Sequence, residues 1–336
     1  MKKALLATTA LMLSAGIAAA DVKISGYGRT GIIYYENTAA QDALGLNETQ
    51  VISRLRMNID ASTETDSGVE FGARFRLQWD QNHADRGGAA ATNPGKIWVR
   101  AQGLTVEVGN VDTAMDSARL IYATDLGSYD RSGAFNPSVD LSGFAGGFFA
   151  YSAQDYAITR VGVAAIYSID DLTVRASYVN PDQTGLTSVE KELGISADYK
   201  WNDRLELSGA YTNNAGGIDG NDLYFVGARY AVLENARIGL NYANADDFVP
   251  ATIGGVANTE AFGQTFALYG DYTLADGLTN IEAYVANNDG DWATKETDNA
   301  FGIGVNYDLG GARLGASIHR DYRELVSADA GVRFEF

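Results

Sequence analysis

Short segments in which every second residue is apolar recur along almost the whole chain, and this alternation constrains the fold most strongly. A period of two is typical of a β-strand with one apolar face, and each segment is bounded by Asn, Asp, Gly or Ser. We place sixteen such strands. Their approximate limits are 22–35, 50–61, 68–80, 96–102, 104–110, 160–169, 171–180, 189–200, 203–213, 221–231, 235–244, 261–273, 278–287, 299–309, 311–320 and 327–336.

The first twenty residues have the pattern of an export signal. Lys2 and Lys3 precede an apolar run that is too short to span a bilayer, and small residues lead into Asp21. We therefore expect residues 1–20 to be a cleaved signal peptide and residues 21–336 to form one domain.

Composition narrows the class of protein further. No apolar stretch near 18 residues follows the signal, so an exported membrane protein of this sequence has to be a β-barrel. The absence of cysteine suits an oxidising periplasm and excludes thiol catalysis. Without Lys2 and Lys3 the chain keeps 23 basic and 43 acidic side chains, a formal charge of −20, which argues against nucleic acid as a partner.

Tight and long connections alternate along the chain, as they do between the periplasmic turns and external loops of outer-membrane barrels. The tight ones fall at 101–104, 169–171, 201–204, 232–235, 275–278 and 308–311. Tyrosines also gather at the strand ends, as in the two aromatic girdles of such barrels. We predict an all-β fold, a 16-stranded antiparallel transmembrane β-barrel among the outer-membrane lipids of a Gram-negative bacterium. A soluble all-β protein is the alternative, since tyrosine is common in any strand.

The closing segment ends in an aromatic residue. Phe336, Phe334 and Val332 share its apolar face, while Arg333 and Glu335 lie on the other. In an exported chain a terminal phenylalanine is the assembly signal of an outer-membrane barrel, so we assign that role to Phe336. Closure would pair this strand with the one that begins at Val22.

Sixteen strands leave a water-filled channel, so the inward faces carry the function. With the apolar residues turned outward, five arginines of the first three strands face inward. They are Arg29, Arg54, Arg56, Arg74 and Arg76. Arginines alternate with apolar residues on any polar-faced sheet, but five on adjacent strands of an acidic chain favour a basic wall. Lys96, Arg100 and Arg333 extend the same side.

A connection of unusual length supplies the opposite charge. Residues 111 to about 159 are too long for an ordinary loop, and we expect this third loop to fold inward. Its carboxylates are Asp112, Asp116, Asp125, Asp130 and Asp140. Facing the arginines, they would form a constriction with a transverse field that orients polar solutes. An exposed acidic surface loop is the alternative, and Ca²⁺ binding by clustered carboxylates is a further possibility without EF-hand spacing.

Several segments resemble the general diffusion porins of Rhodobacter and related alphaproteobacteria. They are the start Asp21-Val-Lys-Ile-Ser-Gly-Tyr-Gly-Arg-Thr-Gly, Arg54-Leu-Arg, Asp66-Ser-Gly-Val-Glu-Phe-Gly-Ala-Arg-Phe-Arg, and the closing Val332-Arg-Phe-Glu-Phe. The resemblance implies a homotrimer of barrels, each narrowed by its third loop, that passes small hydrophilic solutes by passive diffusion without a cofactor. It also matches the five arginines to the basic wall and the loop aspartates to the acidic side.

Other functions have weaker support. An outer-membrane enzyme would need a histidine partner for its nucleophile, but His83 and His319 lie in no catalytic motif and are interpreted as solvated loop or rim residues. An adhesin would not need the arginines. A sugar-specific channel would need a continuous aromatic path, and Tyr27, Trp98 and Tyr284 are the inward aromatics available. The net acidity predicts a mild cation preference, which the arginine wall opposes.

Overall fold

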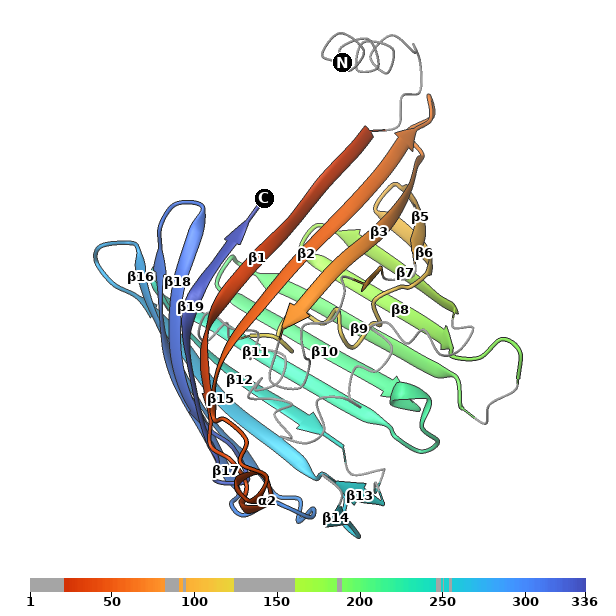
Figure 1. Cartoon of the computed structure of the whole chain (residues 1–336). Helices are drawn as coiled ribbons and strands as arrows, with labels where there is room; N and C mark the ends of the chain where they lie inside the picture. The colour runs from red at the N-terminus through yellow and green to blue at the C-terminus, as the bar shows by residue number, and fades with distance from the viewer. Residues whose placement is uncertain are drawn as a thin grey trace, which may run out of the picture.

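A single closed antiparallel sheet accounts for nearly all of the computed structural model, which describes residues 21–81, 91–92, 95–123, 161–185, 189–245, 249, 251–253 and 256–336 (Figure 1). Its long strands are β1 (Asp21–Tyr35), β2 (Thr49–Glu64), β3 (Glu70–Gln81), β5 (Lys96–Ala101), β6 (Leu104–Gly109), β7 (Val161–Ile169), β8 (Leu172–Asn180), β9 (Glu192–Trp201), β10 (Leu205–Asn213), β11 (Leu223–Leu233), β12 (Ala236–Asn244), β15 (Gln264–Thr273), β16 (Thr279–Asn288), β17 (Asn299–Asp308), β18 (Ala312–Arg320) and β19 (Val326–Glu335). The predicted sixteen-stranded barrel is therefore confirmed.

Short strands and helical turns lie beside the long strands of the barrel. The two-residue strand β4 (Ala91–Thr92) pairs with β3, and β13 (Thr252–Ile253) pairs with β14 (Val256–Ala257) in a small separate ribbon. Helix α2 (Ala39–Ala43) and the 3₁₀ turn η1 (Ala215–Gly217) lie in connections between strands. No helix in the described part of the chain is long and apolar enough to cross a membrane.

The first and last strands close the barrel. β1 pairs with β2 on one side and with β19 on the other, so that Arg29 lies opposite both Arg54 and Arg333 (Figure 1). At the end of this seam the Gly26 N–H donates to the Phe336 carbonyl at 2.8 Å, and the Phe336 N–H donates to the Gly26 carbonyl at 3.0 Å. Closure pairs the first and last long strands of the described barrel, so neither β1 nor β19 presents a free edge along the seam.

Tight turns and long connections alternate between antiparallel strands, so the tight turns lie at one end of the barrel. Gln102 and Gly103, with φ of 48° and 81°, form one, and Asn202 and Asp203, with φ of 51° and 55°, form another. Two successive residues with positive φ match the twist of the strands they join. The turn between β2 and β3 is also tight, which the sequence analysis did not predict. The Gly68 N–H there donates to the Thr65 carbonyl at 2.9 Å.

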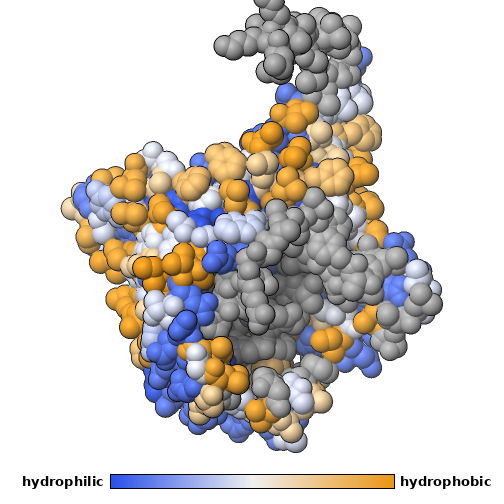
Figure 2. All heavy atoms as spheres, in the orientation of Figure 1, coloured by the Kyte–Doolittle hydropathy of each residue, from blue (hydrophilic) through white to orange (hydrophobic). Residues whose placement is uncertain are grey.

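Alternation along each strand separates the two faces, as predicted. On β1, Val22, Ile24 and Ile32 are 63%, 57% and 56% exposed, whereas Arg29 is only 5% exposed. Apolar residues cover the outside of β1 to β3 in Figure 2. A sheet that is apolar outside and polar inside suits a barrel with lipid around it and water within.

The girdle beside the tight turns is well defined. Its members are Tyr167, Tyr199, Tyr230, Tyr272 and Tyr307, which are between 39% and 44% exposed on the outer face. At the opposite end the tyrosines pack on neighbouring rings, with 4.9 Å between the ring centroids of Tyr211 and Tyr224. Aromatic side chains at these two levels match the two membrane interfaces.

Some predictions fall outside the described residues. These are the signal peptide at residues 1–20, the histidine His83, and the loop aspartates Asp125, Asp130 and Asp140. Cleavage after Ala20 stays a prediction, which the mass of the exported chain would test.

Candidate pore and its charged walls

All five predicted arginines lie on the inner faces of β1 to β3, and strand register fixes their neighbours. Arg29 on β1 lies opposite Arg54 on β2, and Arg56 lies opposite Tyr27. Arg76 on β3 lies opposite Asn58 on β2, and its Nε donates to the Asn58 Oδ1 at 3.0 Å. The structure thus gathers these guanidinium groups on one wall, here called the basic wall.

Carboxylates that the sequence analysis missed lie within the basic wall. Arg74 makes a two-pronged ion pair with Asp60 across the β2–β3 register, at 2.6 Å from Nε and 3.0 Å from Nη2. Arg54 is ion-paired through its Nε with Asp80, which lies opposite it on β3. Such bidentate or charge-assisted contacts hold a guanidinium in one orientation. Asp60 and Asp80 lie an even number of residues from the arginines of their strands, so they face the same side. This alternation could have identified them in the sequence.

Asp112 and Lys96 join the start of the third loop to the basic wall. Lys96 on β5, which the sequence analysis expected to extend the basic side, lies opposite Arg74, and its Nζ is 2.9 Å from Glu107 Oε2. The same Nζ is 3.4 Å from Asp112 Oδ2. The first loop aspartate therefore reaches the positive side of the interior.

The described start of the third loop, residues 110–123, is held against the inner faces of later strands. The Ala114 N–H donates to Ser177 Oγ on β8 at 2.9 Å, and the Arg119 N–H donates to Asp198 Oδ1 on β9 at 3.1 Å. Further along, Asn241 on β12 donates its side-chain amide to the Leu120 carbonyl at 2.7 Å. Each bond ties the loop backbone to a different strand, so this stretch follows the wall across several strands. Within it, the Asp116 carboxylate accepts a hydrogen bond from the Tyr122 hydroxyl.

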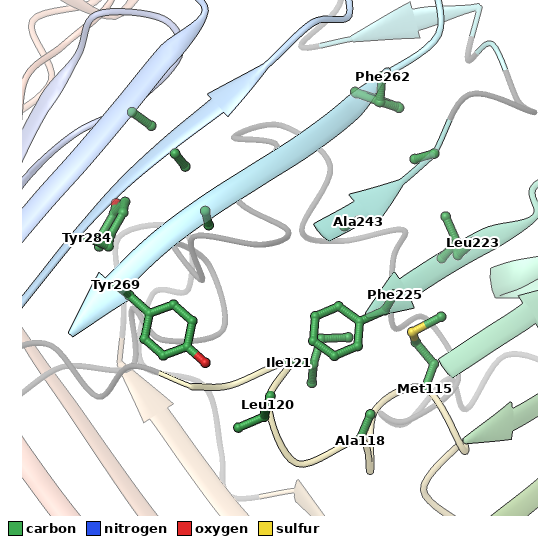
Figure 3. Close-up of a cluster of buried hydrophobic side chains, with 14 of the residues drawn as sticks. Met115, Ala118, Leu120, Ile121, Leu223, Phe225, Ala243, Phe262, Tyr269 and Tyr284 are labelled. Atoms are coloured by element: carbon green, nitrogen blue, oxygen red, sulfur yellow. The ribbon is translucent and has the colours of Figure 1, made fainter. Parts of the chain in front are cut away.

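Apolar side chains fasten the same stretch of loop. Met115, Ala118, Leu120 and Ile121 are each at most 2% exposed. They pack with residues of β11, β12, β15 and β16, which include Leu223, Phe225, Ala243, Tyr269 and Tyr284 (Figure 3). This set, here called the loop anchor, is a hydrophobic cluster inside an otherwise polar lumen. The sequence analysis missed it, although a methionine, a leucine and an isoleucine close together in a long polar loop were a usable signal.

Charges on the strands behind the loop are largely paired. Arg229 Nε lies 2.6 Å from Glu206 Oε2, and Arg175 Nη1 lies 2.5 Å from Asp198 Oδ2. From the loop, Arg119 Nη1 comes within 3.7 Å of Glu206 Oε1. The interior therefore has polar, charged walls over much of its surface, and such walls suit water and hydrated solutes.

Known proteins share both the sequence and the shape of this barrel. A family model described as Gram-negative porin matches residues 7–324. A porin of Fuscovulum blasticum is 38% identical over 322 residues, which cover 94% of this chain and 100% of that protein. The chain belongs to the Gram-negative porin family. A porin of Rhodobacter capsulatus is 25% identical to it over 344 residues, again covering 94% of this chain and 100% of that one.

Solved porin structures have the same fold as this chain. A substituted Rh. blastica porin superposes with a TM-score of 0.78 at 38% identity, covering 94% of this porin and 100% of that chain. A triple mutant of Rhodopseudomonas blastica porin gives 0.73 at 36% identity with the same coverage. The resemblance to porins is thus confirmed. The relatives are channels rather than enzymes, and the family and the β-barrel together point to the outer membrane.

One interpretation of the porin's histidines is wrong. His319 is not a solvated rim residue but is 2% exposed on the inner face of β18. Its Nε2 lies 2.9 Å from Ser317 Oγ and its Nδ1 lies 3.3 Å from the Tyr284 hydroxyl. Ser317 in turn donates to Asp329 at 2.5 Å. The alternation that turns His319 inward was visible in the sequence, but the partners on β16 and β19 depend on strand register.

Inward aromatic residues give little support to a sugar-specific porin. Trp98 is 8% exposed and Tyr284 is 3% exposed. A sugar ring stacks on an accessible aromatic face, and these two rings are covered by protein atoms. Tyr27 is the remaining inward aromatic residue of the three considered, and arginines surround it.

Metal binding stays open for this porin. In the described ranges, no group of three or more His, Cys, Asp or Glu side chains could hold an ion. The predicted Ca²⁺ would have used several loop aspartates, of which Asp125, Asp130 and Asp140 lie outside those ranges. Calcium at the third loop therefore remains a prediction.

Proposed function

We propose that this porin passes ions and small hydrophilic solutes by passive diffusion and selects them by size and charge at a constriction. The constriction lies between the basic wall and the acidic third loop. The basic side consists of Arg29, Arg54, Arg56, Arg74 and Arg76, and the acidic side of Asp112, Asp116, Asp125, Asp130 and Asp140. The observation that supports this best is the loop anchor, which holds the start of the loop inside the barrel.

Charge selection follows from the arrangement of fixed charges in a narrow aqueous gap. Low-dielectric walls reduce screening, so a solute between opposite charges feels a transverse field that favours polar molecules. Asp60 and Asp80 offset part of the positive charge of the basic wall. Together with the acidic composition, this favours a mild cation preference, and a reversal potential of the opposite sign in a KCl gradient would contradict it.

Planar-bilayer recording tests the role of the wall. Arg54→Gln and Arg56→Gln should each shift the reversal potential toward cation selectivity, because each removes a lumen-facing positive charge. Arg204→Gln is the matched control, since Arg204 lies at a tight turn and donates to the Ala231 carbonyl at 2.8 Å. If all three variants keep the parent selectivity and conductance, the wall is not at the constriction. No conductance from folded porin would exclude channel function altogether.

We also propose that three copies assemble, each with its own pore. In the same recordings a trimer should close in three equal current steps. Single steps of one size, together with a monomer mass by light scattering, would argue against the trimer. Addition and chelation of Ca²⁺ during recording would test the predicted calcium at the loop, which should change conductance reversibly.

A further inference from the structure

Tyr27 lies at the centre of the most crowded group of arginines in the basic wall. It faces the lumen from β1, directly opposite Arg56 on β2 and Glu335 on β19. Arg29 follows two residues later on the same face. Arg54 and Arg333 flank Arg29 on the two neighbouring strands. Register alone therefore surrounds one aromatic ring with four guanidinium groups.

The contacts follow this register. The guanidinium carbons of Arg333, Arg56 and Arg29 lie 4.6, 5.3 and 5.7 Å from the centre of the Tyr27 ring. Cation–π attraction acts over such distances because the face of the ring is negative. In addition, Arg54 Nη1 donates to the Tyr27 hydroxyl at 3.3 Å. One side chain thus touches every arginine of the group.

Without the Tyr27 ring, repulsion between the guanidinium groups would drive the arginines apart. Arg333, Arg29 and Arg54 lie directly opposite one another on three adjacent strands, which are about 4.8 Å apart. Like charges in directly opposed positions repel. Long arginine side chains can relieve the repulsion by turning toward the nearest carboxylates, and Asp80 and Glu335 already contact Arg54 and Arg333. The Tyr27 ring opposes this reorientation because it attracts the guanidinium groups to its face.

We infer that Tyr27 is a positioning residue that holds Arg29, Arg54, Arg56 and Arg333 as one cluster and thereby sets the anion permeability of the pore. The inference rests on the proposed role of the basic wall and adds two parts to it. Arg333, which the sequence analysis placed on the basic side, is joined to the cluster by Tyr27, so the cluster continues across the barrel seam. The selectivity also depends on Tyr27, whose side chain carries no charge.

The test compares reversal potentials and open-channel current noise in a KCl gradient. Tyr27→Leu and Tyr27→Gln remove the ring, so the arginines turn toward Asp80 and Glu335, and the chloride-to-potassium permeability ratio should fall by about twofold. The current noise should rise because the arginine side chains are less fixed. Tyr27→Phe keeps the ring and should restore most of the parent selectivity. Tyr199→Leu makes the same change on the lipid face and should alter neither quantity.

A double-mutant comparison tests the partnership with Arg333. Arg333→Gln should shift selectivity toward cations in the parent and shift it less in the Tyr27→Leu background. Parent-like selectivity and noise in both ringless variants would overturn the inference, as would equal effects of Arg333→Gln in both backgrounds. If Arg54→Gln and Arg56→Gln shift selectivity while the Tyr27 variants do not, only this inference fails. If none of these arginine variants shifts it, the proposed constriction fails.

Discussion

At the scale of single residues, a chain of hydrogen bonds fixes where one proton lies. The Ser317 hydroxyl donates to Asp329, which can only accept, so the Ser317 oxygen accepts from Nε2 of His319. When the ring is neutral, its Nδ1 then accepts from the Tyr284 hydroxyl, 3.3 Å away. Gly302 leaves room for both rings, since a Cβ there would lie 2.6 Å from His319 Nδ1 and from a ring carbon of Tyr284.

Replacement of His319 should therefore destabilise the barrel. His319→Leu removes one hydrogen bond from each of the buried Ser317 and Tyr284 hydroxyls, which should cost about 1–3 kcal/mol of unfolding free energy. His319→Gln retains an N–H donor and should lose less. Denaturant unfolding in detergent measures both. An unfolding midpoint for His319→Leu equal to that of the parent would mean that the chain of bonds contributes nothing.

Asp276 gives the stability of a turn a defined pH dependence. Its carboxylate, between β15 and β16, accepts from the Thr279 hydroxyl at 2.6 Å and from the Leu278 and Thr279 N–H groups at 2.9 Å. These bonds lower the pKa of the Asp276 carboxyl. The stabilisation is thus present above the unfolded-state pKa and is lost as the pH falls through the lower folded-state value. Asp276→Asn should make the unfolding temperature less sensitive to acid below about pH 4; an unchanged pH profile would contradict this.

At the scale of elements, the loop anchor should control how stable the open-channel current is. Leu120 is fully buried among strand residues, so Leu120→Ala creates a cavity that weakens loop attachment by about 2–5 kcal/mol. Open-channel noise and brief closures should increase. Leu233→Ala makes the same substitution at a 56% exposed site and should leave the current trace unchanged. If Leu120→Ala shows no more noise or closures than the parent, the hydrogen bonds with Ser177, Asp198 and Asn241 are sufficient to hold the loop.

The seam between β1 and β19 should be sensitive to a single methyl group. A Cβ at Gly31 would overlap the Ala330 carbonyl oxygen and lie 2.9 Å from the Gly331 Cα, both backbone atoms of β19. Gly31→Ala should therefore force the strands apart and lower the yield of folded barrel. Gly209→Ala is the control, because its nearest neighbour would be 3.7 Å away. Heat-dependent gel migration distinguishes folded from unfolded porin, and equal folded yields would contradict the expectation.

The elements differ in how far their sequence determines them. Alternation within one strand is local, so it predicted the sixteen strands and the inward direction of Arg29 and Arg74. Ion pairs such as Arg74 with Asp60 join neighbouring strands and needed the register, which a turn of unknown geometry sets. The apolar loop residues of the loop anchor could have been noticed in the sequence, but their partners could not, because Leu120 meets Phe225 and Tyr269 only after the barrel has closed.

At the scale of the whole molecule, we expect assembly of the barrel to depend on Phe336. We propose that Phe336 is the assembly signal, and its deletion should reduce insertion more than conductance. The deletion also removes the two backbone bonds to Gly26, whereas Phe336→Ala keeps them and removes only the ring. Both variants should insert poorly if the ring is recognised, while the channels that do form should conduct normally. Normal insertion of Phe336→Ala would assign the effect to the backbone bonds.

The pairing of β1 with β19 also dictates when this chain can fold. One edge of β1 has no partner until residues 326–335 have been made and exported, so the sheet cannot close while the chain is still emerging. Contacts between such distant segments form slowly, and an open strand edge meanwhile invites aggregation. We therefore expect the porin to cross the periplasm before its sheet has closed, so that its survival there depends on holding chaperones more than on the stability of the finished barrel.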